Sequence, residues 1–260
     1  MKKLNFSVTK PIIGMVHLNP YKSGKRFLDD ALKDIKSLAD GGIDGLLYEN
    51  WSGLYIGETP MRDTREYIAT VIKEASKVYD LPYGINVLPL DYRAAFDIAK
   101  ATGAAFVQVD TFVDELIDLS HTYKLETSSK SVMRYKASLG LGDLALFTNI
   151  QSKHYHTLPP NKKLETSALQ AIKNGSDAIV VTGRLTGLET PKEKLLRVNK
   201  VCGETPVFIG SGLSERNVRR LLPYADGAIV GTSLKEGGVT DNAVDEKRVR
   251  RLMRIVNSLR

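Results

Sequence analysis

The chain has little cysteine, little tryptophan and no long apolar run among its 260 residues. Its single cysteine, Cys202, cannot form an internal disulfide, so a reducing cytoplasm fits the composition. No hydrophobic stretch approaches the roughly 20 residues that a transmembrane helix needs. A short apolar run follows Lys10, but the small-residue cleavage site of a signal peptide does not come after it. We therefore expect a cytoplasmic protein.

Metal and dinucleotide motifs are also missing from the sequence. No G-x-G-x-x-G follows the first predicted strand, which argues against a dinucleotide-binding open sheet, and we predict no cofactor. No H-E-x-x-H occurs, and His154 and His156 are only two positions apart. Glu49, Asp110 and His17 could converge with them, so a divalent metal stays open as an alternative.

The net charge of +7 suits anionic ligands, nucleic acid or an acidic membrane surface, and it selects none of them. No nucleic-acid module and no stripe of basic and aromatic residues is present, which argues against nucleic-acid binding. Segment 245–260 predicts a basic amphipathic helix that begins at the capping residue Asp245. Such a helix suits the outer layer of a domain, and peripheral membrane association is the alternative.

Eight short apolar runs rich in β-branched residues alternate with helical patterns, which predicts parallel βα units. Eight units at this length favour one (β/α)8 barrel over residues 1–260, with an open doubly wound sheet as the alternative. The irregular stretch 111–130 follows the fourth strand, where either a lid or a surface excursion fits. The predicted strands cover residues 11–17, 43–49, 83–88, 105–110, 144–151, 177–182, 206–209 and 227–230.

Glycine turns follow the last two predicted strands, after 206–209 and 227–230. Glycine leaves backbone N–H groups uncovered, and a helix that begins behind the turn adds positive potential. The loops after the last two strands are where (β/α)8 barrels commonly bind phosphate. We therefore expect a phosphorylated small molecule as the ligand. The residues expected to hold its phosphate are Gly183, Gly210, Ser211, Gly212, Gly231, Thr232 and Ser233.

Polar residues stand at the carboxyl ends of the predicted strands, where the reacting groups of such barrels lie. We expect Glu49 to be the general base and Lys153 the acid or electrophile. Asn86 and Asp110 would orient the substrate. A structural salt bridge between Glu49 and Lys153 is the alternative. The complete set of candidate catalytic residues is His17, Glu49, Asn86, Asp91, Asp110, Lys153 and His154.

Strand alternation and helix capping bear on three of these candidates. Adjacent residues of a strand face opposite ways, so Lys153 and His154 would not both point inward. Asn149, Gln151 and Lys153 would share one polar face, which favours Lys153 as the inward residue. Asp91 precedes a predicted helix, so helix capping competes with a catalytic role there.

The ordered motifs along the chain resemble the BtpA family, also called BtpA/SgcQ. The resemblance implies a phosphate-binding TIM barrel of the ribulose-phosphate-binding type. The chain departs from the family pattern at four positions. Pro89 and Gln108 replace arginines, Leu90 replaces an asparagine, and Asn149 replaces an aspartate. The motifs are Val16-His17-Leu18, Asp44-Gly45, Glu49-Asn50, Gly84-x-Asn86, Lys153-His154, Thr186-Gly187, Gly210-Ser211-Gly212, Gly231-Thr232-Ser233 and Val244-Asp245-x-x-Arg248.

Two functions follow from the resemblance and the candidate residues together. The first is an enzyme that acts on a phosphorylated sugar or nucleoside-like metabolite, with isomerase, lyase and nucleosidase-type chemistry all open. The second is a non-catalytic, membrane-associated assembly factor, because the family takes its name from a member linked to photosystem I biogenesis. A homo-oligomer is expected by analogy with other barrels of this type.

Overall fold

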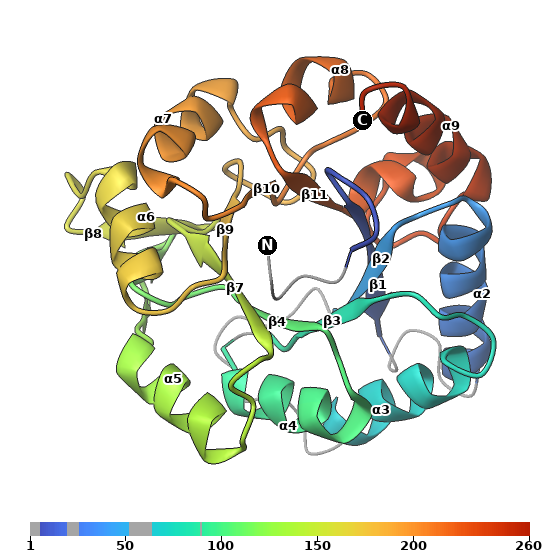
Figure 1. The fold of residues 1–260 in the computed structure, drawn as a ribbon, viewed down its shortest axis with the longest axis horizontal. Coiled ribbons are helices and arrows are strands. Elements are labelled where there is room, and N and C mark those ends of the chain that lie inside the picture. Colours follow the sequence, from blue (N-terminus) through green and yellow to red (C-terminus); the bar gives the residue numbers. More distant parts are fainter. Residues whose placement is uncertain (1–5, 20–25, 52–63, 89) are drawn as a thin grey trace.

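The computed structural model describes residues 6–19, 26–51, 64–88 and 90–260. Eight parallel strands close into a barrel in the order β1-β11-β10-β9-β7-β4-β3-β2, and Figure 1 looks along the barrel. The predicted (β/α)8 barrel is confirmed. Its strands are β1 (Ile12–Leu18), β2 (Gly45–Asn50), β3 (Tyr83–Asn86), β4 (Phe106–Val109), β7 (Ala145–Ile150), β9 (Ala178–Val181), β10 (Val207–Ile209) and β11 (Gly227–Val230).

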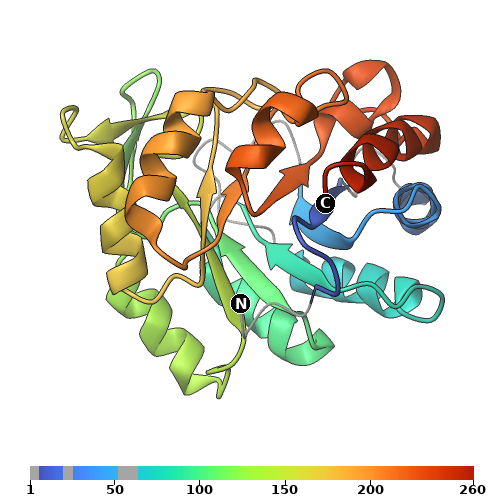
Figure 2. The same cartoon turned by 45° about the horizontal axis from the view of Figure 1, so that its top comes forward.

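An outer ring of helices surrounds the barrel (Figures 1 and 2). Each longer helix has an apolar stripe that faces inward; α2, for example, buries Ala31, Ile35 and Leu38. The α-helices are α2 (Phe27–Asp40), α3 (Thr64–Ala75), α4 (Tyr92–Thr102), α5 (Ser129–Ser138), α6 (Leu164–Lys173), α7 (Lys192–Cys202), α8 (Val218–Leu221) and α9 (Glu246–Asn257). Short 3-10 turns occur at η2 (Leu222–Tyr224), η3 (Thr232–Leu234) and η4 (Glu236–Gly238).

The barrel interior changes from apolar to polar along the strands. Leu47 of β2 and Phe147 of β7 belong to an apolar cluster inside the barrel. Because strand residues two positions apart share a face, Glu49 and Asn149 follow them at the carboxyl ends of the same strands. The barrel interior is therefore apolar in its lower part and polar at the carboxyl ends of the strands, which we call the barrel mouth.

A small antiparallel sheet interrupts the βα pattern at one side of the barrel (Figure 2). It has the order β6-β5-β8, formed by β5 (Glu115–Asp118), β6 (Lys124–Leu125) and β8 (Tyr155–Leu158). The prediction of an irregular stretch over 111–130 is therefore wrong for Glu115–Asp118 and Lys124–Leu125, because β5 pairs both with β6 and with β8, a segment that follows β7. Leu125 and Tyr155 of this sheet line the barrel mouth.

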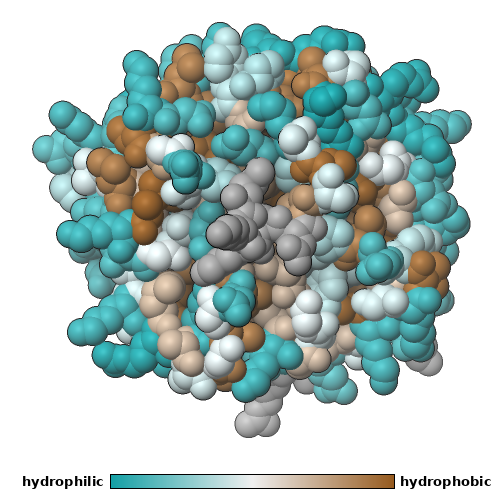
Figure 3. All heavy atoms as spheres, in the orientation of Figure 1, coloured by the Kyte–Doolittle hydropathy of each residue, from teal (hydrophilic) through white to brown (hydrophobic). Residues whose placement is uncertain are grey.

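The last helix, α9, packs its apolar face against the barrel domain. Val249, Leu252 and Val256 are buried, and the Asp245 side chain caps the helix by accepting hydrogen bonds from backbone amides of its first turn. In the space-filling view of Figure 3, hydrophilic side chains predominate around the rim of the molecule. Among the described residues, no helix is both long and apolar enough to cross a membrane.

Candidate functional site at the barrel mouth

A cavity of about 140 Å³ lies at the carboxyl ends of the strands, and we call it the mouth cavity. Side chains from β1, β2, β4 and β7 line one part of it, and loops that follow β9, β10 and β11 line the other part. Both groups of predicted site residues thus contribute to one cavity. Its polar lining includes His17, Glu49, Gln108, Asp110, Asn149, Lys153, His154, Ser211, Gly212 and Thr232.

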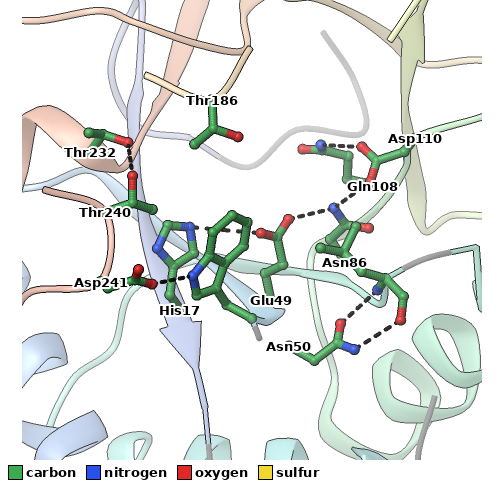
Figure 4. A network of polar contacts seen from close by, with 12 residues as sticks. His17, Glu49, Asn50, Asn86, Gln108, Asp110, Thr186, Thr232, Thr240 and Asp241 are labelled. Carbon is green, nitrogen blue, oxygen red and sulfur yellow. Dashed lines mark hydrogen bonds and ion pairs between the residues drawn. The ribbon is translucent and has the colours of Figure 1, made fainter. Parts of the chain in front are cut away.

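Glu49, Asn86 and Asp110 form a hydrogen-bonded carboxyl cluster at the ends of β2, β3 and β4 (Figure 4). The Asn86 side-chain amide donates to Glu49 Oε2 at 2.8 Å and lies 3.4 Å from Asp110 Oδ2. Asn149 donates to Asp110 Oδ1 at 2.5 Å. One amide therefore ties two carboxyl groups together, and a second amide fixes Asp110 from the next strand of the barrel.

The environment of Glu49 favours its protonated form. Burial is the main cause that raises its pKa to about 7 from an ordinary 4.5, and the charge of Asp110 acts in the same direction. Lys153 and the hydrogen bond from Asn86 lower the pKa. Burial also raises the pKa of Asp110, against the charge of Lys153. A carboxyl group whose pKa is near neutrality can both take and give a proton, as general acid–base catalysis requires.

His17 is held as a neutral side chain beside the carboxyl cluster. Burial, followed by the charges of Lys235 and Lys153, holds its pKa well below the ordinary value. Its Nε2 atom lies 3.7 Å from Glu49 Oε1, and its ring stacks on Trp51 with 5.1 Å between centroids. Trp51 is fixed in turn by donating from Nε1 to Asp241 at 2.7 Å (Figure 4).

Lys153 reaches the mouth cavity from the loop that follows β7. Within the part of the chain that the structure describes, its ammonium group makes no hydrogen bond and no ion pair. Its charge nevertheless acts on the pKa values of both Glu49 and Asp110. Glu49 and Lys153, which are both described, do not form the salt bridge that was the alternative. The Lys153 ammonium group does not lie within 4.0 Å of a Glu49 carboxylate oxygen. Lys153 is therefore a cation available to a ligand.

The prediction that Asn149, Gln151 and Lys153 share one polar face is wrong for Gln151. Strand β7 ends at Ile150, and Gln151 adopts a positive φ of 45°. Its side chain turns outward and donates to the Lys162 carbonyl at 3.0 Å. Alternation therefore does not extend past Ile150, and Lys153 and His154 both line the cavity.

His154 and Asp91 have contacts that suit structural roles. His154 Nε2 accepts a hydrogen bond from the Thr186 amide at 3.2 Å and lies 2.9 Å from its hydroxyl, which joins two loops of the mouth. Asp91 accepts from the Ala94 amide at 2.8 Å and caps α4. Asp91 is not among the residues that line the mouth cavity, and the helix capping considered for it in the sequence is formed.

The loops that follow β10 and β11 lie side by side. The Ser233 hydroxyl donates to the Leu213 carbonyl at 2.6 Å, which joins the two loops directly. Among the described residues, no acceptor is found for the backbone amides of Gly212, Thr232 and Ser233. We call these three amides the amide cluster. Gly212 has a φ of 67°, which favours glycine at this turn.

Among the described residues, the amides of Ser211 and Gly231 also have no acceptor, and both residues line the mouth cavity. The Gly183 amide, the Gly210 amide and the Ser211 hydroxyl are instead used inside the protein. The Gly183 amide donates to the Ser211 hydroxyl at 2.7 Å, and that hydroxyl donates to the Leu188 carbonyl. The Gly210 amide donates to the Val181 carbonyl at 2.8 Å. These groups hold the loops in place, so they leave the set of groups that could bind an anion.

The sequence reasoning overlooked Trp51 and Tyr155 at the mouth. Trp51 is the only tryptophan of the chain and directly follows Glu49-Asn50, which was a usable signal. Tyr155 begins β8, which the sequence pattern did not reveal. Among the described residues, no group of three His, Cys, Asp or Glu side chains is arranged to hold a metal ion.

Solved structures show the same architecture at low sequence identity. A structure described as native KDPGal superposes with a TM-score of 0.64 at 13% identity, covering 98% of both chains. Phosphoribosyl anthranilate isomerase from Thermus thermophilus gives a TM-score of 0.59 at 12% identity, covering 96% of this chain and 100% of the isomerase. At these identities the similarity establishes the barrel fold.

Sequence relatives match nearly the whole chain. An uncharacterised protein of Pyrococcus furiosus is 34% identical, with 100% of this chain and 99% of the relative covered. The photosystem I biogenesis protein BtpA of Synechocystis is 30% identical, with 94% of this chain and 87% of the relative covered. The model of the BtpA family matches residues 8–258. The chain therefore belongs to the BtpA family.

Proposed function

We propose that this protein is an enzyme that transfers protons on a phosphorylated small molecule bound in the mouth cavity. The observation that carries this proposal is the arrangement of one cavity with two different ends. At one end a buried Glu49 with a pKa of about 7 lies beside Asp110 and an unpaired Lys153. At the other end are the uncovered amides of Gly212 and Thr232.

The amide cluster suits a phosphate group. Backbone N–H groups at the start of a helical turn point at an anion and carry positive potential, and here η3 begins at Thr232. Binding a phosphate away from the reacting bond holds the rest of the substrate in position, which lowers the barrier of the chemical step. The phosphorylated part of the substrate therefore provides the orientation.

The carboxyl cluster suits proton transfer on the rest of the substrate. In this proposal Glu49 is the general base, and Asp110 with Asn86 sets its pKa and orientation. Lys153 stabilises negative charge that develops on a substrate oxygen or donates a proton to it. Isomerisation, retro-aldol cleavage and glycosidic hydrolysis all contain such steps. We place the reaction in the cytoplasm, consistent with the buried free thiol of Cys202.

The test is a thermal-shift screen of sugar phosphates and nucleoside phosphates, followed by mass spectrometry of each stabilising compound after incubation with the protein. The expected result is stabilisation by phosphorylated compounds, absence of stabilisation by their dephosphorylated forms, and conversion of at least one compound. Glu49→Gln should keep the stabilisation and lose the conversion. Equal stabilisation by the phosphorylated and dephosphorylated forms would contradict the proposal.

The assembly-factor alternative is supported by the name of the Synechocystis relative, a photosystem I biogenesis protein. The contacts of α9 favour the enzyme, because the helix buries its apolar face and several of its arginines are already engaged. Arg250 pairs with Glu246, and Arg251 donates to Glu215 at 2.9 Å. A helix that binds a membrane surface needs that apolar face for the lipid.

A further inference from the structure

The amide cluster opens onto a second space on its outer side. This outer cleft has a volume of about 350 Å³ and shares Gly187, Gly212, Gly231 and Thr232 with the mouth cavity. The two spaces therefore meet at the amide cluster. The rest of the outer cleft is formed by the loop after β10, the turns η3 and η4, and the first half of α9.

The outer cleft has uncovered amides of its own. Within the described part of the chain, the amides of Leu213 and Gly237 donate to no acceptor. Gly237 and Gly238 have φ values of 63° and 71°, a conformation that favours glycine, and they leave no side chain over the backbone. Leu213 and Gly237 therefore add to the outer cleft two lining residues whose amides have no acceptor among the described residues.

Two arginines line the outer cleft. Arg248 donates to the Ser233 carbonyl at 3.1 Å, directly beside the amide cluster, and its Nε atom also lies 3.7 Å from Asp245 Oδ2, which compensates part of its charge. Arg216 lines the cleft and makes no hydrogen bond or ion pair with any described residue. The acidic residue in the wall, Glu215, is held by Arg251 at 2.9 Å. Arg216 is therefore free to contact an anion.

A single phosphate has five heavy atoms, and a phosphate held at the amide cluster would leave most of the outer cleft, with its volume of about 350 Å³, open to a second group. We infer that the site binds two linked phosphates, one at the amide cluster and the second in the outer cleft between Arg216, Arg248 and the Gly237-Gly238 turn. The inference rests on the proposed function and narrows its substrate class to diphosphates.

The test compares inorganic phosphate with pyrophosphate by isothermal titration calorimetry in metal-free buffer at constant ionic strength. We expect pyrophosphate to bind the wild-type protein at least tenfold more tightly than phosphate. Arg216→Ala should remove most of that difference and leave phosphate affinity within about twofold. Arg216 is exposed, so its replacement should not disturb folding. Arg254→Ala is the matched control, because Arg254 is an exposed arginine of α9 that does not line the cleft.

The outcomes separate this inference from the proposed function. If phosphate binds and pyrophosphate binds no more tightly, the second subsite is excluded while the first remains. The same conclusion follows if Arg216→Ala and Arg254→Ala weaken pyrophosphate binding equally, because net charge alone would then explain the preference. If neither anion binds at millimolar concentration, the amide cluster is not a phosphate site, and both proposals are overturned.

Discussion

The two ends of the mouth cavity use different chemical groups. The end formed by β1 to β7 has the carboxyl groups of Glu49 and Asp110, whose pKa values are raised by burial and lowered by the charge of Lys153. The end formed after β10 and β11 has backbone amides, whose partial charge does not titrate. In the proposed function, the groups that react and the groups that bind the phosphate therefore lie in separate parts of the chain. Each can therefore be changed without the other.

The largest expected effect separates turnover from binding. Lys153→Ala and Glu49→Gln should each lower the turnover of any substrate found by about 10²–10⁴-fold, the usual contribution of a general acid or base. Affinity for inorganic phosphate, measured by calorimetry, should change less than twofold, because the amide cluster is formed by other loops. Loss of phosphate affinity in both variants would show that the two ends of the cavity act together.

The carboxyl cluster should also leave a signature in the pH dependence of stability. The pKa of Glu49 is raised to about 7 in the folded protein from 4.5, so the folded state binds the proton more tightly than the unfolded state. The free energy of unfolding should therefore fall as the pH rises through this window, by roughly 3 kcal/mol for this one group.

Urea unfolding between pH 4.5 and 8 measures that dependence. Glu49→Gln should remove the contribution of Glu49 from this slope, because the glutamine does not titrate, and should leave the contributions of Asp110 and His17. Glu236→Gln, at an exposed position away from the carboxyl cluster, is the matched control and should keep the wild-type slope. Parallel curves for all three proteins would mean that Glu49 titrates normally, and the general-base assignment would lose its physical basis.

A charge placed at the amide cluster should affect binding alone. Thr232 is partly exposed and lines both the mouth cavity and the outer cleft. Thr232→Glu should weaken phosphate binding on the order of a hundredfold, since like charges placed together cost several kcal/mol. Thr232→Val keeps the backbone amide and should bind phosphate almost as wild type. If the valine variant loses binding equally, the hydroxyl and not the amide is the ligand-binding group.

The smallest effect is expected on the outer surface. Arg250→Glu with Arg254→Glu should leave the flotation of the protein with acidic vesicles unchanged, because the apolar face of α9 is buried in the fold. The wild-type protein should remain in the unbound fraction. Salt-sensitive binding of the wild type that the double substitution removes would favour the membrane-associated alternative.

Much of this molecule could be predicted from sequence because its patterns are local. Eight apolar runs, the helix stripes and the caps at Asp91 and Asp245 depend on residues a few positions apart. The positions of Glu49, Asn86 and Asp110 followed from where the strands end.

What could not be predicted depends on contacts between distant segments. In the small antiparallel sheet, β5 pairs with β8 through residues about forty positions apart, such as Glu115 with Leu158, and no local pattern encodes that pairing. The early end of β7 at Ile150 moved Gln151 away from the mouth. The sequence likewise could not show which glycine amides lack an acceptor. The Gly183 amide, for example, donates to the Ser211 hydroxyl, which belongs to the loop after β10.

The measurement that tests the central claim most directly is a titration of the ¹⁵N-labelled protein with inorganic phosphate, followed by amide NMR. The expected result is a saturable shift of the Gly212, Thr232 and Ser233 amide signals at one common dissociation constant, with the Gly183 and Gly210 signals moving much less. Absence of shifts at the three amides, or larger shifts elsewhere on the protein, would contradict the account.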